Sequence, residues 1–247
     1  MAENKKDFIT RYYPEARCGG FTEVDGTIPF YLRINELIQP DSAVLDIGCG
    51  RAAYADDPVR IRRELRILKG KCKTVIGIDV DVAASDNPFL DRFRLIETEH
   101  WPVDDESVDL SVCDYVLEHI RDVPVFFGQA HRVLRKGGYL CIRTPNTLSY
   151  FVMASRLIPD GLHARVLSRV QDGRHEEDVF PKYYRCNRMG KLRKTLSEAG
   201  FDGVVWAHEA EPSYLAFSRW SYAFGVFLHR LLPRWLNSSL IAFGRKI

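Results

Sequence analysis

The sequence predicts a doubly wound α/β fold, in which helices cover both faces of a mostly parallel β-sheet. From residue 26 onward, short apolar runs alternate with patterns of helical periodicity. Runs that are apolar throughout suit strands buried on both faces, and their alternation with helices predicts βαβ units. With 46% hydrophobic and 28% charged residues among 247, the composition is globular and excludes a disordered, collagen-like or coiled-coil protein.

Seven apolar runs are the predicted strands, at residues 43–47, 74–78, 93–96, 108–113, 139–143, 204–206 and 240–243. The first run ends in Gly48-Cys49-Gly50 and the second ends at Asp79. The carboxyl ends of parallel strands meet at one edge of the sheet, where ligands bind in this class of fold. We therefore expect the functional residues at that edge.

Four helical patterns fill the gaps between the strands, at residues 28–38, 58–68, 123–134 and 188–199. Asp57 as N-cap and Pro58 as first helical residue predict the start of the second helix. Gly200 predicts the end of the fourth, because glycine adopts the left-handed conformation common after a helix. No repeat or linker-like stretch interrupts the chain, so one domain over 1–247 is expected.

Charge and cysteine usage exclude further classes of protein. The chain has 35 Lys and Arg against 33 Asp and Glu, and the net charge of +2 argues against a general nucleic-acid binder. Its six cysteines lack metal-site spacing, so we expect reduced thiols and no metal. No signal-peptide core or membrane-spanning stretch is present in the sequence, and a cytoplasmic location is expected.

The C-terminal segment differs from the rest of the chain, because residues 213–247 contain five basic residues and no acidic ones. A helix is predicted within 213–235. One broad face of it holds Phe217, Trp220, Phe224, Phe227, Leu228 and Leu231, and the opposite face holds Arg219, Val226 and Arg230. Three interpretations stay open: the helix covers the sheet, lines a hydrophobic acceptor pocket, or makes a peripheral contact with the inner face of an anionic membrane.

The turn after the first strand is the first sign of a ligand site. Its pattern from Gly48 to Ala53 also matches a dinucleotide fingerprint. Two features favour another ligand. Asp46, just before the turn, is costly to bury unless it meets a positive or hydrogen-bonding group. The next helix is predicted to start near Pro58, too far along the chain for its N-terminus to meet a pyrophosphate at the glycines.

Five linked motifs over residues 43–146 resemble those of class I S-adenosylmethionine-dependent methyltransferases. They are VLDIGCG (44–50), VIGID (75–79), ETEHWP with DESVD (97–109), DYVLEHI (114–120) and RVLRKGGYL (132–140). The departures are Ala52 or Ala53 in place of a third glycine, Lys136 in place of a proline, and a long connection over 51–73.

The resemblance implies a Rossmann-like α/β fold with a seven-stranded, mostly parallel sheet of order 3-2-1-4-5-7-6 and helices on both faces. It divides the single methyltransferase domain into three parts. Residues 1–42 would form an N-terminal lid and first helix, and 43–146 the cofactor-binding core. Residues 147–247 would supply acceptor-side insertions, the last strands and the amphipathic helix.

S-adenosylmethionine is the cofactor that the resemblance implies. Asp79 would hold the ribose hydroxyls, Glu97 the adenine amino group, and Asp46 with the Gly48 carbonyl the methionine ammonium. The expected cofactor-binding residues are Asp46, Gly48, Cys49, Gly50, Asp79, Val80, Glu97, Thr98, Asp114 and Tyr115. Each of the three acids also has a structural interpretation, as a capped strand end, a turn former or a solvated loop residue.

His119 and Glu118 are the predicted catalytic residues, because they follow the fourth strand, close to where the methyl group is expected. A hydroxyl acceptor needs a general base, and the pKa of histidine suits that role. The alternative is that both residues only cap and orient the following helix. His100 is a weaker candidate for the base.

The acceptor is expected to be a small molecule, a glycan or a lipid-linked compound, bound partly by residues 147–186, where charges and tyrosines mix. Two other functions stay open. One is a non-catalytic module that binds S-adenosylmethionine, and the other is an NAD-dependent oxidoreductase. The sequence leaves the oligomeric state undetermined.

Overall fold

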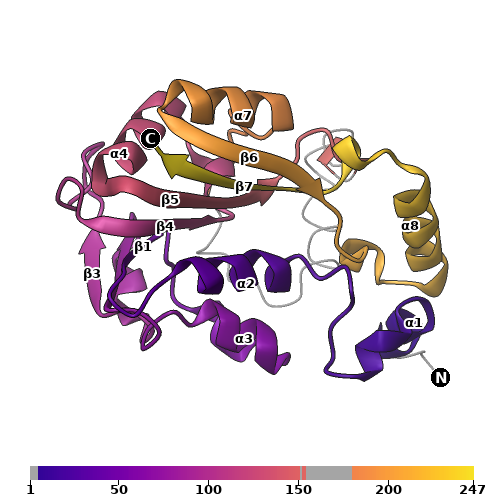
Figure 1. The fold of residues 1–247 in the computed structure, drawn as a ribbon. Helices are drawn as coiled ribbons and strands as arrows, with labels where there is room; N and C mark the ends of the chain where they lie inside the picture. The colour runs from indigo at the N-terminus through magenta and orange to yellow at the C-terminus, as the bar shows by residue number, and fades with distance from the viewer. Residues whose placement is uncertain (1–4, 151, 154–179) are drawn as a thin grey trace.

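A computed structural model describes residues 5–150, 152–153 and 180–247 and confirms the predicted α/β architecture (Figure 1). One seven-stranded sheet has the predicted order β3-β2-β1-β4-β5-β7-β6. Its strands are β1 (Ala43–Ile47), β2 (Thr74–Asp79), β3 (Arg92–Leu95), β4 (Val108–Asp114), β5 (Leu134–Pro145), β6 (Phe201–His208) and β7 (Ser239–Lys246). The first five strands pair in parallel, and β7 is antiparallel to both β5 and β6.

Helices cover both faces of the sheet (Figure 1). On one face lie α2 (Thr27–Leu37) and α3 (Arg60–Arg66), and on the other α4 (Val123–Val133) and α7 (Met189–Glu198). Beyond the end of the sheet stand α1 (Lys5–Tyr12) and α8 (Arg219–Leu231), side by side (Figure 1). None of the described helices is both long and apolar enough to cross a membrane.

Two hydrophobic cores, one on each face of the sheet, hold these layers together. Leu45 of β1 packs in the core that contains Leu192 of α7, whereas its neighbour Val44 packs with Phe30 of α2. All four side chains are 0% exposed. Successive strand residues point to opposite faces, so a fully apolar strand serves both cores at once. The apolar runs in the sequence therefore became strands.

The structure corrects the predicted start of the second helix. Asp57 was expected to cap it, but α3 begins at Arg60 with Val59 at the N-cap and no capping side chain. The Asp57 carboxylate instead accepts a hydrogen bond from the Val59 backbone N–H at 2.9 Å and binds the Arg62 guanidinium at 2.8 Å. This arginine contact holds the chain in a turn before the helix starts.

The outer strands β6 and β7 are longer than their apolar cores predicted. They form a regular antiparallel ladder from the pair Phe201 and Lys246 to the pair His208 and Ser239. Backbone hydrogen bonds extend such a ladder whatever the side chains are, so hydropathy underestimates its length. The helix α1 was not predicted from the sequence pattern.

The predicted apolar face of the C-terminal helix does not cover the sheet. On α8 the buried residues are Tyr222, Gly225 and Val226, although Val226 was placed on the face opposite the aromatic residues. Phe224 and Phe227, which were expected on the apolar face, are 60% and 58% exposed. The buried side packs against Ile9, Tyr12 and Tyr13 near the N-terminus instead.

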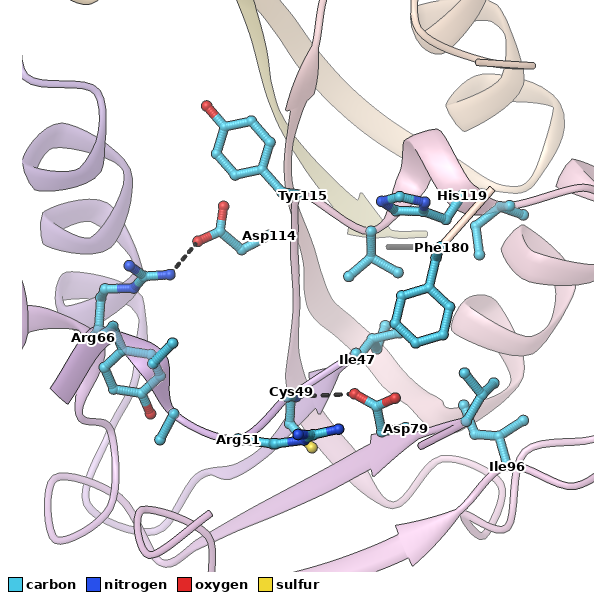
Figure 2. Close-up of a pocket in the computed structure, with 18 of the residues that line it drawn as sticks. Ile47, Cys49, Arg51, Arg66, Asp79, Ile96, Asp114, Tyr115, His119 and Phe180 are labelled. Carbon is cyan, nitrogen blue, oxygen red and sulfur yellow. Dashed lines mark hydrogen bonds and ion pairs between the residues drawn. The ribbon is translucent and has the colours of Figure 1, made fainter. Parts of the chain in front are cut away.

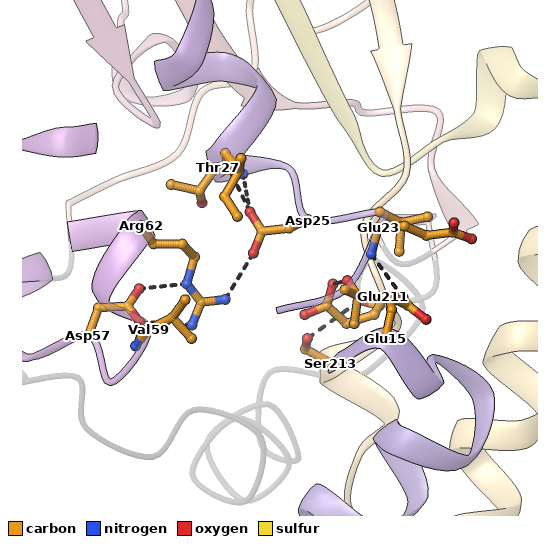
Figure 3. Close-up of polar contacts among 12 residues, drawn as sticks. Glu15, Glu23, Asp25, Thr27, Asp57, Val59, Arg62, Glu211 and Ser213 are labelled. Carbon is orange, nitrogen blue, oxygen red and sulfur yellow. Dashed lines mark hydrogen bonds and ion pairs between the residues drawn. The ribbon is translucent and has the colours of Figure 1, made fainter. Parts of the chain in front are cut away.

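The segment before α2 is attached to α3 by Asp25, which Figure 3 shows between Thr27 and Arg62. One carboxylate oxygen accepts from the backbone N–H groups of Thr27 and Ile28, at 2.8 and 2.9 Å. The other binds Arg62 at 3.0 Å. The start of α2 and the first turn of α3 are therefore fixed to each other, which places the arginines of α3.

Gly77 in β2 provides a test of the core. A Cβ there would overlap Leu90 Cδ1 and lie 2.8 Å from Cys49 Sγ, and both of these side chains are buried. Gly77→Ala is expected to lower the free energy of unfolding by roughly 1–3 kcal/mol through overpacking. Gly128→Ala on α4, where no atom lies within 4 Å, is the matched control. It should raise that free energy by about 0.5–1 kcal/mol. Chemical denaturation measures both, and equal effects would contradict the packing argument.

Candidate active site

A cavity of about 960 Å³ lies at the carboxyl ends of β1, β2 and β4 (Figure 2). Its walls come from the turn after β1, the first residues of the segment after β2, residues 114–120, the arginines of α3 and residues 180–183. A volume of this size accommodates a cofactor-sized ligand with further space beside it. The described residues before β1 do not line it, so the lid role of 1–42 stays a prediction.

The turn after β1 brings the backbone to the cavity wall. Gly48 and Gly50 have φ angles of +66° and +55°, in the left-handed region that favours glycine. A Cβ on Gly48 would also lie 2.5 Å from Val116, so a side chain is excluded there. Ala52 has a φ of +62°, which identifies it as the residue in the position of the third glycine. Cys49 lies in this turn, and burial raises the pKa of its thiol.

Asp79 closes the turn from the neighbouring strand. Its buried carboxylate accepts hydrogen bonds from the Gly50 N–H at 2.9 Å and the Asp81 N–H at 3.0 Å (Figure 2). Val80, next along the chain, is 61% exposed and also lines the cavity. The carboxylate is thus held at the cavity wall by two backbone donors.

Asp46 lies behind the turn, beside a separate space of about 10 Å³ bordered by Tyr31, Tyr54 and Arg66. No described residue donates a hydrogen bond to its carboxylate. Burial and the negative charge of Asp114 raise the pKa of Asp46 to about 7, although Arg66 opposes them. A positive ligand group near this carboxylate would favour its ionised form.

Asp114, at the end of β4, binds several elements at once. Arg143 of β5 donates to both of its carboxylate oxygens, at 2.7 and 2.8 Å, and the Tyr31 hydroxyl donates at 3.0 Å. Arg66 of α3 lies 3.4 Å away (Figure 2). Burial opposes ionisation, but the two arginines outweigh it and hold the pKa of Asp114 below its ordinary value.

Tyr115 follows with a φ of +58°, an unusual conformation for a tyrosine. Its backbone N–H donates to the Arg143 carbonyl at 2.8 Å, and its hydroxyl lies 3.2 Å from Ser239 Oγ. The Arg143 guanidinium lies 4.9 Å from the centre of its ring. These contacts hold the strained residue in the cavity wall, where the ring is 42% exposed.

His119 lines the cavity, and Figure 2 shows its ring close to Phe180. Its Nδ1 lies 2.9 Å from the Pro181 carbonyl oxygen. Because a carbonyl only accepts, Nδ1 carries the hydrogen, and in the neutral ring Nε2 is the basic nitrogen. The sequence-predicted His119 is therefore at the cavity with a defined tautomer.

Glu118 points away from the cavity and is 3% exposed. Thr144 donates to its carboxylate at 2.9 Å, and Asn187 donates to the Thr144 hydroxyl at 2.6 Å. The carboxylate lies 4.0 Å from His119 Nε2. The structure thus places Glu118 inside the protein on the Nε2 side of His119, and not at the cavity wall.

The remaining predicted residues are less closely associated with the cavity. Glu97 and Thr98 are exposed and do not line it, whereas Ile96 and Trp101 on either side of them do. Their adenine-binding role stays a prediction. Of the expected acceptor segment 147–186, Phe180, Pro181 and Tyr183 line the cavity, and residues 151 and 154–179 lie outside the described residues.

Sequence reasoning missed the arginines of the cavity wall. Arg62 and Arg66 both line it, and their four-residue spacing on α3 places them on one face of the helix. That spacing was visible in the sequence, but nothing indicated which face of α3 meets the cavity. Arg51, in the turn after β1, also lines it and forms a 2.8 Å ion pair with Asp81.

Comparison with known proteins gives a consistent result. A family model described as "Methyltransferase domain" matches residues 23–205. A Mycolicibacterium smegmatis protein named "Probable S-adenosylmethionine-dependent methyltransferase" is 31% identical over 112 residues, which is 43% of this chain and 39% of that protein. An arsenite methyltransferase of Halobacterium salinarum is 28% identical over 70% of this chain and 41% of its own length. The chain thus aligns with about two fifths of these relatives.

Solved structures agree on the fold. The crystal structure of a SAM-dependent methyltransferase from Archaeoglobus fulgidus has a TM-score of 0.56. The alignment covers 94% of this chain and 97% of that one, at 16% identity. At such low identity, the likeness shows the architecture alone.

The buried Glu118 predicts a specific pH dependence of stability. Burial raises the pKa of its carboxyl to about 7 from an ordinary 4.5. Folding therefore favours the protonated form, and this contribution is present below the ordinary pKa and lost as the pH rises through the folded value. Glu118→Gln keeps an acceptor for Thr144. The wild-type protein should lose this contribution as the pH rises, whereas the variant should not. The unfolding free energy of the variant minus that of wild type should therefore increase by roughly 2–3 kcal/mol from about pH 4 to about pH 8.

Urea denaturation of both proteins across this pH range measures the effect. The pKa of Asp46 is also raised to about 7, but Asp46 is present in both proteins. Its contribution therefore cancels when the unfolding free energy of wild type is subtracted from that of the variant. Glu99→Gln, at an exposed position, is the control and should follow wild type. A Glu118→Gln curve parallel to wild type at all pH values would contradict the prediction.

Proposed function

The chain belongs to the methyltransferase domain family, and from this membership we propose that it transfers the methyl group of S-adenosylmethionine to a small-molecule, glycan or lipid-linked acceptor. The observation that carries the proposal is the joint position of the Gly48–Gly50 turn and Asp79 at one cavity wall. A carboxylate held by backbone donors is suited to a ribose diol, and the exposed backbone of the turn allows close approach of a ligand.

The residues around the turn fit the rest of this cofactor. Asp46 has a carboxylate that no described residue hydrogen-bonds, and a pKa raised to about 7 by burial and Asp114. The methionine ammonium would supply the missing positive partner, through the turn or through a water molecule. Apolar walls at Ile96, Trp101 and Phe126 suit a flat aromatic base.

The cofactor supplies an activated methyl group on a sulfonium, so the protein must mainly position the acceptor and exclude water. For a hydroxyl acceptor, the cavity wall would hold the hydroxyl oxygen beside the methyl group that the bound cofactor would supply, and the hydroxyl proton would pass to the protein. His119 Nε2 takes the hydroxyl proton, and the hydrogen bond from Nδ1 to Pro181 keeps the ring in the tautomer that this requires. Glu118 is buried and its carboxylate lies 4.0 Å from Nε2, so it is proposed to position His119 and to stabilise the protonated ring rather than to contact the acceptor.

The acceptor space combines aromatic and cationic walls. Tyr115, Phe180 and Tyr183 provide flat surfaces, and Arg66 provides a guanidinium. These suit an acceptor that has an apolar or ring-shaped part with a polar or anionic group. The arsenite methyltransferase of Halobacterium salinarum and a similar Hamiltonella defensa protein, named "Malonyl-[acyl-carrier protein] O-methyltransferase", carry unlike acceptors in their names, so they favour no particular acceptor.

Cofactor binding is tested through Asp79. S-adenosylhomocysteine should raise the thermal unfolding midpoint of the wild-type protein, because a ligand that binds only the folded state stabilises it. Asp79→Asn removes a charged acceptor and should weaken S-adenosylhomocysteine binding by about 10- to 100-fold. Isothermal titration calorimetry measures the affinity, with Asp86→Asn at an exposed position as control. Absence of any stabilisation of wild type would exclude the cofactor.

The role of His119 is tested by His119→Ala. Loss of the general base should lower turnover by about 10²- to 10⁴-fold while the affinity for S-adenosylhomocysteine stays unchanged. The assay follows labelled methyl transfer to acceptors identified in a metabolite screen. His100→Ala, at an exposed histidine outside the cavity, is the matched control and should retain full turnover. Unchanged turnover in His119→Ala would assign His119 a structural role only.

A further inference from the structure

The outer side of α8 and the residues just before and after it form an exposed surface, here called the aromatic face. It consists of Phe217, Trp220, Phe224, Phe227, Leu231 and Trp235, whose side chains are between 51% and 74% exposed. Monomeric proteins rarely leave so many large apolar side chains together at the surface. Single exposed apolar residues need no explanation, but a helix face made of them indicates a partner.

The packing of α8 prevents this face from turning inward. A Cβ on Gly225 would lie 2.7 Å from Pro212 and 2.8 Å from Leu215, so the helix backbone rests directly on the preceding turn. Tyr222 is 0% exposed, and its ring centre lies 5.8 Å from that of Tyr12 of α1, with the two rings tilted by 48°. This packing buries one side of the helix and leaves the aromatic face outside.

A polar anchor fixes the far end of α8 in the same orientation. His229 Nε2 lies 2.6 Å from the Tyr150 hydroxyl and 3.7 Å from a Glu209 carboxylate oxygen. Glu209 follows β6, and its carboxylate also accepts from the Ser238 N–H at 3.1 Å, just before β7. Side chains at positions 222, 226 and 229 thus hold the helix, while positions 220, 224, 227 and 231 are left outside.

The charge around the aromatic face identifies its partner. Residues 213–247 contain no Asp or Glu, and Arg219, Arg230 and Arg234 are exposed beside the aromatic side chains. A second copy of the chain docked through the same face would bring arginine toward arginine, which is unfavourable. Aromatic and basic side chains on one helix are what an anionic lipid surface selects, since rings enter the headgroup region and arginines meet lipid phosphates.

We propose that the aromatic face of α8 is a docking surface for an anionic lipid bilayer. Segment 235–239 links this surface to the cavity, because Asn146 donates to the carbonyls of Trp235 and Asn237 and Tyr115 contacts Ser239. Docking would therefore hold the cavity edge of the sheet beside the membrane. The consequence that an acceptor arrives from the bilayer rests on the proposed function, whereas docking itself does not.

Vesicle sedimentation of the whole protein tests the docking. Wild type should sediment with vesicles of phosphatidylcholine mixed with phosphatidylglycerol at low salt, and less with phosphatidylcholine alone or at high salt. The double variant Phe224→Ser with Phe227→Ser should lower the partition coefficient by at least about tenfold, because two rings no longer enter the lipid. Arg230→Gln and Arg234→Gln should each lower it about fivefold on the anionic vesicles only.

Controls separate docking from folding and from methyl transfer. Leu32→Ser on α2, where the side chain is 55% exposed, and Lys194→Gln on α7 should both bind vesicles like wild type. All variants should keep the thermal midpoint of wild type and its shift with S-adenosylhomocysteine, so that cofactor binding is scored independently of docking.

Three results would overturn the proposal. The first is the absence of binding to anionic vesicles at low salt, and the second is equal binding by wild type and the double serine variant. The third is a concentration-dependent dimer, seen by light scattering, that the double serine variant abolishes. That result would assign the face to self-association.

Discussion

The pairing of Asp114 with Arg143 is the interaction on which the site depends. Both side chains are almost fully buried, and the guanidinium binds both carboxylate oxygens. The pair joins the carboxyl ends of the central strands β4 and β5, and each of the two residues also contacts a helix. Arg143 donates to Thr27 at the start of α2, and Asp114 receives Arg66 of α3. Loss of either partner would leave an uncompensated buried charge, which costs far more than the intact pair contributes. Such a pair therefore defines geometry more than it adds stability.

The electrostatics of the cavity follow from this pairing. Because Arg143 is committed to Asp114, it is not available to the other acids of the edge. Arg62 is likewise committed, to Asp25 and Asp57. Burial and negative neighbours raise the pKa of Asp46 to about 7 against the opposing charge of Arg66, while the pKa of Asp114 is held low. Carboxylates on adjacent strands are thus prepared for different tasks, one structural and one open to a cationic ligand group. Arg66 contacts Asp114 through one guanidinium nitrogen, whereas its Nε has no hydrogen-bond partner among the described residues.

The sequence was informative where local hydropathy decides the structure, as in the strands. It was misleading where contacts between distant segments decide it, as in the burial of α8 and the start of α3. Apolar runs located the strands, and the motif resemblance supplied their order. The aromatic face of α8 was the reverse case, since periodicity identifies an apolar side but not what covers it. The side of α8 that is buried is the one that contains Gly225, whose lack of a side chain permits close packing, and His229, which forms the polar anchor. Asp57 was misjudged for a similar reason, because its contact with Arg62 moves the helix start and no propensity scale includes that contact.

The placement of α8 separates the proposed docking surface from the proposed active site. The helix is inserted between β6 and β7, and their ladder is complete up to the pair His208 and Ser239. The insertion leaves and re-enters the sheet at neighbouring positions, so its length and outer surface place no strain on the strands. The cavity walls come from the other side of the sheet order, from β1, β2 and β4. Substitutions on the outer side of α8 therefore share no partner with the Asp114 and Arg143 pair, and their effects should add rather than couple. An exposed helix of this kind can vary in its surface chemistry while the cofactor edge keeps its geometry.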